Sequence, residues 1–321
     1  MKSIVVAGAS SFVGCHLARE FAQKGWAVTA TLSQSRDAYD GIKAERLKWI
    51  EKFVSWQTLD LRDEKPVRNF IARIKPNLWL HHAGYAVNYG SPDYDLRTAH
   101  AVNVEPLVYI YEELAKAGCG GVIVTGSSME YADTDQACLE TDECKPSTPY
   151  GQSKLEETKT AAKLSERHGV PTSVARLFIP FGPLDAPNKV IPYVVENLKN
   201  GQPADLSPCT QRRDFLYVGA VVKAYGLLAE DLKRGAFEIF NICNGEVVAV
   251  RRVIEMIADR LGASRELLGF GKRPMRPGEP SVSYGSCEKA QQLLGWRSGT
   301  LEEGIAEFLR VEAELAIGAR S

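Results

Sequence analysis

An apolar run at the start of the chain, followed at once by a glycine-containing turn, most constrains the fold. Residues 2–7 are almost wholly apolar, as expected of a parallel strand that is buried on both faces. Residues 8–14 (Gly-Ala-Ser-Ser-Phe-Val-Gly) follow directly; an amphipathic helix then runs to Lys24 and Gly25, and a second strand covers residues 27–32. In such a strand–turn–helix–strand unit, backbone N–H groups at the helix N-terminus can hold a pyrophosphate. The segment therefore predicts an α/β fold with a nucleotide-binding turn.

The alternation of strands and helices continues well beyond this unit. One strand pattern ends at residues 58–61, and residues 78–84 and 121–125 form two further strand patterns. A helical pattern opens at residues 103–106 and ends near Gly118. We therefore predict a Rossmann-type, doubly wound parallel sheet, in which the strand ends meet in one crevice.

The turn in residues 8–14 supplies the candidate phosphate contacts. Gly8 allows a tight turn, and Gly14 allows the helix to pack closely on the strand. Ser11 stands where the usual spacing has its middle glycine, and its hydroxyl is a candidate hydrogen-bonding group. The residues expected to bind the cofactor here are Gly8, Ser10, Ser11, Phe12, Val13 and Gly14. A glycine-rich turn without a ligand is the alternative.

The end of the second strand bears on the choice of cofactor. Residues 32–36 (Leu-Ser-Gln-Ser-Arg) contain no acid to bind ribose hydroxyls and repel a 2′-phosphate. Ser33 and Arg36 suit a phosphate, so NADP(H) is favoured and NAD(H) stays possible; alternatively, Arg36 lies on a solvated loop. Further along the chain, Asp60 is expected to meet the adenine amine and Leu61 to cover the ring. Ala83 and Gly84 follow the next strand, where small residues let a cofactor approach.

Tyr150 and Lys154 form a candidate acid/base pair. Four residues apart on a helix, they lie on the same face. A phenol has a pKa near ~10, and a neighbouring ammonium stabilises the phenolate and lowers that pKa. The pair can therefore exchange a proton with a carbonyl or alcohol oxygen, although the spacing alone is also typical of a solvated helix.

With these motifs the chain resembles the extended short-chain dehydrogenase/reductase family, in its nucleotide-sugar epimerase, dehydratase and reductase branch. The resemblance covers nearly the whole length. It rests on residues 8–14, 60–61, 83–84, Asn103, Ser127 four residues before Tyr131, Tyr150 with Lys154, and the segments 176–183, 213–215, 240–242 and 276–278. It implies that Tyr150 is the acid/base, that Lys154 binds the ribose and lowers the Tyr150 pKa, and that Ser127 hydrogen-bonds the reacting oxygen. A hydroxyl aimed at an oxygen that gains charge stabilises the transition state.

After Gly182 and Pro183 the alternation becomes less regular, which suggests a smaller C-terminal substrate-binding lobe. We expect residues 1–177 to form the dinucleotide-binding domain, with residues 214–245 returning to it, and residues 178–321 to form mainly the substrate-binding lobe.

The resemblance also implies four substrate-binding residues, namely Ser128, Ile179, Arg213 and Arg276. Arg213 and Arg276 match positions that clamp the diphosphate of a nucleotide sugar, which suits guanidinium forks; surface arginines are the alternative. Ile179 stands where many relatives carry an asparagine that contacts the substrate phosphates. This departure leaves the identity of the substrate open.

The residues after Ser127 bear on the reaction. Dehydratases of this branch carry a glutamate two positions beyond the catalytic hydroxyl, whereas this chain has Ser128 and Met129 there and Glu130 one residue late. We therefore expect NADPH-dependent reduction of a nucleotide-linked 4-keto-6-deoxyhexose, with hydride going to C4 and Tyr150 as proton donor. An NAD-dependent nucleotide-sugar C4 epimerase is the alternative. A carbonyl reductase for a non-nucleotide substrate and a non-catalytic NADP-binding regulator also stay open.

Composition excludes other classes of function. The net charge of −1 gives no basic field for nucleic acid, and no apolar run is long enough to span a bilayer. The start of the chain lacks a signal-peptide pattern, and seven dispersed cysteines without CxxC spacing are typical of reduced thiols. We expect a cytoplasmic protein without a metal, since His81 and His82 face opposite ways on a strand. Relatives imply a homodimer through the helices that begin near Asn103 and Tyr150.

Overall fold

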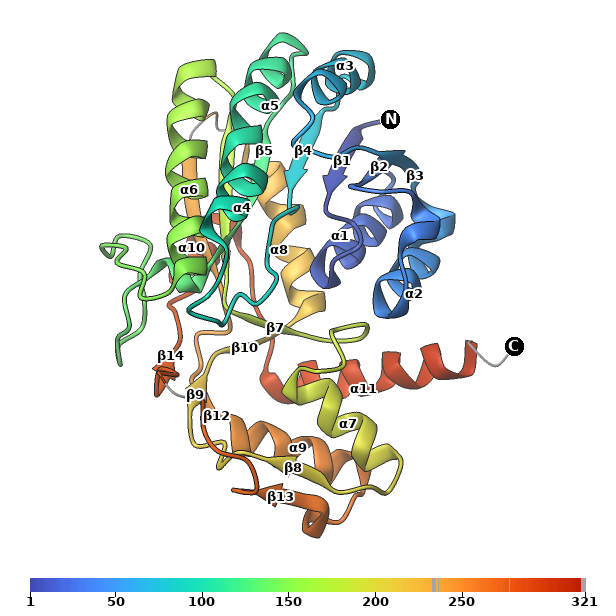
Figure 1. Ribbon diagram of the computed structural model, residues 1–321, viewed down its shortest axis with the longest axis vertical. Coiled ribbons are helices and arrows are strands. Elements are labelled where there is room, and N and C mark those ends of the chain that lie inside the picture. Colours follow the sequence, from blue (N-terminus) through green and yellow to red (C-terminus); the bar gives the residue numbers. More distant parts are fainter. Residues whose placement is uncertain (233–234, 236, 277, 319–321) are drawn as a thin grey trace.

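A parallel sheet of seven strands forms the larger part of the computed structural model, which describes residues 1–232, 235, 237–276 and 278–318 (Figure 1). The strands are β1 (Ser3–Ala7), β2 (Ala27–Leu32), β3 (Ser55–Thr58), β4 (Leu78–His81), β5 (Val122–Ser127), β6 (Thr172–Leu177) and β11 (Phe237–Ile242). Their order is β11-β6-β5-β4-β1-β2-β3, so the direction of winding reverses between β1 and β4. Such a reversal opens a crevice beyond the carboxyl ends of the strands. The predicted Rossmann-type, doubly wound sheet is confirmed.

Helices cover both faces of this sheet. One face carries α3 (Glu64–Ile74), α5 (Glu105–Lys116) and α6 (Pro149–His168), and the other carries α1 (Phe12–Gln23), α2 (Gly41–Ile50), α8 (Val218–Asp231) and α10 (Glu288–Leu294). Strand β1 shows why both faces are apolar. Ile4 and Val6 belong to the core beneath α1 and α8, whereas Val5 and Ala7 belong to the core beneath α3 and α5, because successive side chains of a strand point to opposite faces.

Two element boundaries differ from the sequence prediction. The helix expected to open at residues 103–106 begins earlier, as α4 (Leu96–Ala99), and continues through the π-helical turn η3 (His100–Val104) into α5. Asp95 explains the earlier start, since its side chain accepts a hydrogen bond from the Thr98 N–H and caps α4. Strand β4 ends at His81 rather than near residue 84, because the chain after it turns to pack on the Gly8 turn.

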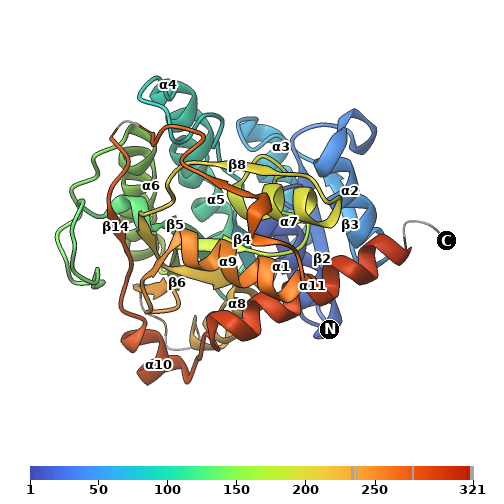
Figure 2. The ribbon, with the colours of Figure 1, turned by 90° about the horizontal axis from the view of Figure 1, so that it is seen from below.

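A second, smaller group of elements lies beyond the carboxyl ends of the strands (Figure 1). It consists of α7 (Val190–Lys199), α9 (Val250–Leu261) and short strand pairs, with its own apolar core of residues such as Val194, Ile254 and Phe308. The strands are β7 (Ile179–Phe181) with β10 (Phe215–Tyr217), β8 (Ala204–Leu206) with β13 (Leu268–Phe270), and β9 (Arg212–Arg213) with β12 (Val248–Ala249) and β14 (Val282–Ser283). Seen from below, α7, α9 and α11 (Leu301–Gly318) lie in front of the sheet (Figure 2).

The chain crosses between the two groups more than once. After β10 it returns to the sheet as α8 and β11, then enters the smaller group through β12 and α9. Residues 288–294 lie within the segment assigned to the smaller lobe, yet they form α10 and pack beside β11. Short helical turns complete the structure: η1 (Arg36–Ala38), η2 (Glu51–Phe53), η4 (Ser128–Glu130) and η6 (Arg265–Leu267). Among the described residues, no helix combines the length and apolarity needed to cross a membrane.

Candidate active site

The carboxyl edge of the sheet carries the predicted acid/base residues. Ser127 is the last residue of β5, and Tyr150 and Lys154 lie in the first two turns of α6. The start of α6 packs directly on η4, so closely that a Cβ on Gly151 would lie 2.1 Å from the Met129 carbonyl oxygen. The side chain of Thr148 accepts a hydrogen bond from the Gly151 N–H and caps the helix. The fold thus places two distant stretches of sequence at one edge.

Tyr150 lies against two other tyrosine rings. The ring centroids of Tyr89 and Tyr94 are 5.5 and 5.6 Å from that of Tyr150. Burial raises the pKa of the Tyr150 phenol above its usual 10, while Lys154 acts in the opposite direction. The expectation that Lys154 brings the pKa down holds for the sign of its own contribution only, because burial outweighs it. In this state, Tyr150 is a protonated phenol at neutral pH.

Lys154 has a buried carboxylate as its partner. Its Nζ donates to Oε2 of Glu157 across 2.5 Å, and the two side chains are 9% and 1% exposed. Burial acts to lower the Lys154 pKa, but the charges of Glu157 and Tyr150 raise it above the usual value. Glu157 itself has its pKa raised to about 7 by burial, against the effect of Lys154. Because its pKa is raised, Lys154 stays charged at neutral pH.

Ser127 is placed by a network beneath it. The Glu130 carboxylate accepts a hydrogen bond from the Ser127 N–H (2.8 Å) through Oε1 and one from Arg176 Nε (2.9 Å) through Oε2. Arg176 also donates to the Tyr131 hydroxyl (2.8 Å), and Glu130 and Arg176 are almost fully buried. The Ser127 Oγ accepts from the Met129 N–H (3.2 Å), which leaves its own O–H free to donate. Glu130 is thus turned away from the crevice.

Asn103 ties the crossover segment to α6. Its amide oxygen accepts from the Tyr85 N–H (2.7 Å), and its amide nitrogen donates to the Ser153 hydroxyl (3.0 Å). Asn103 lies in the π-helical turn η3, the kind of irregular turn that often marks functional sites. The turn orients the segment that carries Tyr85, Tyr89 and Tyr94.

The glycine-containing turn has the geometry of a phosphate cradle. Gly8 has φ +91°, and a Cβ on it would lie 2.7 Å from the Ala83 nitrogen; a Cβ on Gly14 would lie 2.2 Å from the Gly8 carbonyl oxygen. The Ser11 hydroxyl donates to the Gly8 carbonyl (2.8 Å) and accepts from the Gly14 N–H (3.0 Å). The Ser11 side chain therefore caps the N-terminus of α1. Phe12 and Val13 carry the other N–H groups of this first turn, which have no partner inside a helix.

The remaining predicted cofactor residues surround this turn. Ser10 belongs to the turn itself, and its carbonyl accepts from Arg46. Gly84 follows Ala83 and lies beside the Asn103 amide. After β3, the Asp60 carboxylate accepts from the backbone and the guanidinium of Arg62. Leu61 is buried in the core next to α5, with its carbonyl accepting from the Tyr109 hydroxyl.

Arg36, in the η1 turn that follows β2, already has an acidic partner. Its guanidinium lies 2.6 Å from the Glu51 carboxylate, and both side chains are nearly half exposed, at 44% and 49%. Ser33 is also exposed, and its hydroxyl lies 3.3 Å from that of Tyr39. An exposed ion pair of this kind contributes only about 0–1 kcal/mol, so an incoming phosphate can displace the Glu51 carboxylate.

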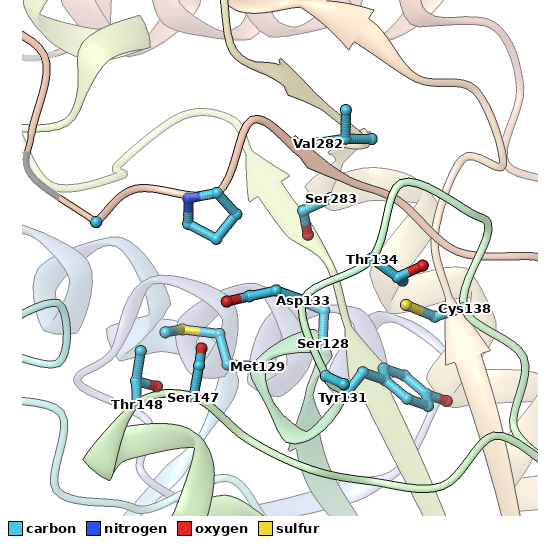
Figure 3. A pocket seen from close by; sticks show the side chains of 13 residues that line it. Ser128, Met129, Tyr131, Asp133, Thr134, Cys138, Ser147, Thr148, Val282 and Ser283 are labelled. Carbon is cyan, nitrogen blue, oxygen red and sulfur yellow. The ribbon is translucent and has the colours of Figure 1, made fainter.

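A pocket opens beside Ser127 between the two groups of elements. Figure 3 shows Met129, Ser147 and Thr148 on one side and Val282 and Ser283 on the other. The other lining residues are Ser128, Tyr131, Ala132, Asp133, Thr134, Cys138, Gly278 and Pro280. Of the predicted substrate residues, this pocket contains Ser128.

The other predicted substrate residues lie on the smaller group. Arg213, in β9, is 7% exposed and donates to the Glu279 carboxylate at 2.8 Å. Arg276 lies on the same turn as Glu279, whose N–H donates to the Arg276 carbonyl, and its guanidinium comes within 3.9 Å of the position for a Cβ on Gly90. Ile179 begins β7 and packs against the smaller apolar core, away from the lining of the pocket.

Several residues around the site were missed by the sequence interpretation. Glu157 and Glu279 are partners of the predicted residues Lys154 and Arg213, His81 lies next to Glu157, and Tyr89 and Tyr94 flank Tyr150. The spacing of Lys154 and Glu157, three residues apart on one helix, could have indicated the first of these. No cluster of potential metal ligands occurs among the described residues.

The sequence and the fold are similar to those of known proteins. The model of the NAD dependent epimerase/dehydratase family matches residues 4–243. UDP-glucose 4-epimerase 2 of Arabidopsis thaliana is 26% identical over 342 residues, covering 96% of this chain and 93% of that protein. dTDP-4-dehydro-6-deoxyglucose reductase of Escherichia coli is 24% identical over 318 residues, covering 96% of each. UDP-glucuronic acid 4-epimerase from Bacillus cereus, in complex with UDP-glucuronic acid and NAD, superposes with a TM-score of 0.84 at 20% identity, covering 98% of this chain and 100% of that one.

Proposed function

The chain belongs to the NAD dependent epimerase/dehydratase family, and from that premise we propose that it is an NADPH-dependent reductase of a nucleotide-linked 4-keto-6-deoxyhexose. Hydride goes to C4 of the sugar, and Tyr150 gives its proton to O4, so that the ketone becomes a secondary alcohol while NADPH is oxidised to NADP⁺. The E. coli relative, whose name describes a reductase of a dTDP-linked 4-keto sugar, supports this choice.

The observation that carries the proposal is the position of Glu130. Elimination of water needs a carboxylate or a comparable base beside the substrate. Of the three residues that follow Ser127, which are Ser128, Met129 and Glu130, the carboxylate belongs to Glu130. Its two oxygens are occupied by Arg176 and by the Ser127 N–H inside the core. Met129 lines the pocket instead. Asp133 is the acid that lines the pocket, whereas Ser127, Tyr150 and Lys154 at the carboxyl edge of the sheet are groups that donate protons and hydrogen bonds.

Three side chains divide the chemistry among them. Ser127 would donate its O–H to the sugar O4, since its oxygen accepts from the Met129 N–H through one lone pair and the O–H itself stays available. Tyr150 transfers its proton to the same oxygen as negative charge develops there. Lys154 would hold the cofactor ribose with the N–H groups that Glu157 does not use. When bound, the nicotinamide cofactor supplies the hydride.

The turn in residues 8–14 fits a dinucleotide. A side chain on Gly8 or Gly14 would strike backbone atoms, so the turn must stay open and close to the strand end. The N–H groups of Phe12 and Val13, at the positive end of the α1 dipole, would hold the pyrophosphate. Ser33 and Arg36 would hold the 2′-phosphate of NADP(H), with Glu51 displaced.

The smaller group of elements would hold the nucleotide part of the substrate. Arg213 and Arg276 would bind the diphosphate, with Arg213 exchanging Glu279 for a phosphate oxygen. In this assignment residues 178–321 form mainly the substrate-binding lobe, and residues 1–177 with residues 214–245 bind the cofactor.

We further propose a homodimer that forms through α5 and α6. Val108, an apolar residue of α5, is 49% exposed.

A C4 epimerase is the second candidate. The Arabidopsis relative carries an epimerase name, and the B. cereus structure contains NAD rather than NADP. An epimerase must keep its cofactor bound and return the hydride to the same carbon. Reduction and epimerisation therefore differ in whether the cofactor is consumed.

The test is to supply UDP-, GDP-, CDP- and dTDP-linked 4-keto-6-deoxyhexoses with NADPH or NADH and to follow absorbance at 340 nm. We expect stoichiometric NADPH oxidation with one nucleotide, and a fall of about 10²-fold or more in kcat for Tyr150→Phe. The opposite outcome is that the protein carries tightly bound NAD and interconverts C4 epimers without net NADPH consumption. That outcome would show that the protein is an epimerase and not a reductase.

A further inference from the structure

Glu157 is a buried ionisable group in direct contact with the proposed acid/base pair. It lies on α6, three residues after Lys154, where both side chains share the face that packs on the sheet. Its Oε2 accepts from Lys154 Nζ, while Oε1 has no hydrogen-bond partner and is fully buried. A buried carboxylate oxygen without a hydrogen-bond partner is costly.

The side chain that faces this oxygen is His81, in β4. Its Nε2, likewise buried without a partner, lies 3.9 Å from Glu157 Oε1. Trp79, two residues earlier on the same face of the strand, donates its indole N–H to His81 Nδ1 across 3.4 Å. An indole nitrogen can only donate, so the proton of the neutral imidazole lies on Nε2 and points toward Glu157. The carboxylate therefore accepts a hydrogen bond from the Lys154 ammonium on one side, and on the other side it faces an imidazole N–H that is too far away for a hydrogen bond.

We propose that Glu157 is a positioning residue that holds the Lys154 ammonium and offsets its charge, so that Tyr150 works as a proton donor rather than as a phenolate base. An enzyme that first oxidises an alcohol needs a base at this position, whereas an enzyme that reduces a ketone needs an acid. The negative charge of Glu157 favours the protonated phenol of Tyr150, which is its proton-donating form. This inference rests on the proposed function, since it assumes that Tyr150 is the group that exchanges the proton.

Charge and geometry support the direction of this effect. Seven residues along a helix separate Tyr150 and Glu157 by about 10 Å, and a negative charge at that distance opposes formation of a phenolate. The charge of Glu157 is among the causes that raise the Tyr150 pKa, and the charge of Lys154 acts the other way. With both charges present, their opposite electrostatic effects on the Tyr150 phenol partly cancel.

Other titratable groups also surround the pair, and none of them repeats the function of Glu157. The groups that act on Tyr150 are Lys154, Glu157, Tyr89, Tyr94 and Glu130. The groups that act on Glu157 are Lys154, His81, Tyr111 of α5, Tyr225 of α8 and Glu130. Arg176 neutralises Glu130, and burial keeps the Tyr111 and Tyr225 phenols protonated. Burial also keeps His81 neutral, with its pKa lowered to about 3.

The test is a spectroscopic titration of Tyr150 that needs no substrate. The difference in phenolate absorbance near 295 nm between the protein and its Tyr150→Phe variant isolates this one phenol. The same difference is then measured in the Glu157→Gln background. We expect Glu157→Gln to move the Tyr150 transition down by roughly one pH unit, which is about tenfold in its ionisation constant. An unchanged or upward transition would overturn the proposal.

Glu156→Gln is the matched control, because Glu156 is the preceding residue of α6 and its side chain points outward to His100. It removes the same charge and should leave the transition in place; an equal shift would count against the proposal. If Glu157→Gln folds poorly, Glu157→Leu removes the charge with an apolar side chain and should give the same shift. Failure of the reductase assay alone leaves this titration intact, so the two proposals fail separately.

Discussion

At the scale of single residues, the partners of the charged groups decide what each of them can do. Arg36, Lys154 and Arg213 all matched positions expected to face a ligand, and each has an acid of this same chain beside it. These ion pairs differ in how exposed their side chains are. Arg36 and Glu51 are exposed and easily parted, whereas Lys154 and Glu157 are buried and stay together.

Arg36 gives a prediction about the choice of cofactor. Arg36→Ala should raise the KM for NADPH about tenfold and leave the KM for NADH almost unchanged, because only NADPH carries the 2′-phosphate and a hydrogen bond to a charged group contributes about 1.5–3 kcal/mol. Glu51→Gln, which frees the guanidinium, should lower the KM for NADPH. Initial-rate measurements with both cofactors check this, and equal changes for NADPH and NADH would show that Arg36 does not contact the phosphate.

At the scale of elements, the start of α6 is the part of the fold on which the site depends most. Thr148 caps it, Pro149 suits its first position, and Gly151 lets it approach η4. The Tyr-x-x-x-Lys spacing predicted that both side chains share a face, and the helix confirms this. The close contact with Met129 could not be predicted, because it depends on where β5 ends relative to α6 in space.

Gly151 therefore carries a prediction about this contact. Gly151→Ala places a Cβ 2.1 Å from the Met129 carbonyl oxygen, and backbone cannot yield as a flexible side chain does. We expect α6 to shift and kcat/KM to fall by roughly 10²-fold, the usual consequence of moving catalytic groups by about 1 Å. Gln152→Ala, an exposed neighbour in the same turn, is the control and should retain activity. Full activity in Gly151→Ala would mean that η4 adapts without moving Tyr150.

At the scale of the whole molecule, the two groups of elements provide two binding surfaces that meet at the carboxyl edge of the sheet. Each has its own apolar core, and the turn that carries Arg276 comes close to Gly90 in the segment after β4. Cofactor and substrate should therefore stabilise the protein through different residues.

Thermal unfolding with added ligands checks this division. NADP⁺ at about 100 times its Kd should stabilise the fold by roughly 2.7 kcal/mol, and a nucleoside diphosphate should add to that shift. Arg213→Gln should abolish the response to the nucleoside diphosphate and keep the response to NADP⁺. Loss of both responses would indicate that Arg213 supports the whole fold rather than the substrate surface.

The sequence by itself determined the architecture and the class of chemistry. Apolar strands, the turn between Gly8 and Gly14 and the pair Tyr150 and Lys154 are local patterns, and local patterns depend on backbone geometry that a few neighbouring residues set. They were sufficient to predict the doubly wound sheet and to place the acid/base pair on one face of a helix.

Only the tertiary structure decided how the charged groups pair. Glu130 meets Arg176 across 46 positions and Arg213 meets Glu279 across 66, and these partners come together through the crossovers of the sheet and through the smaller group. Burial likewise decides the protonation of Tyr150, and burial is a property of the packed molecule. Electrostatics depends on distance and solvent in three dimensions, which is why the reaction is less evident from the sequence than the fold.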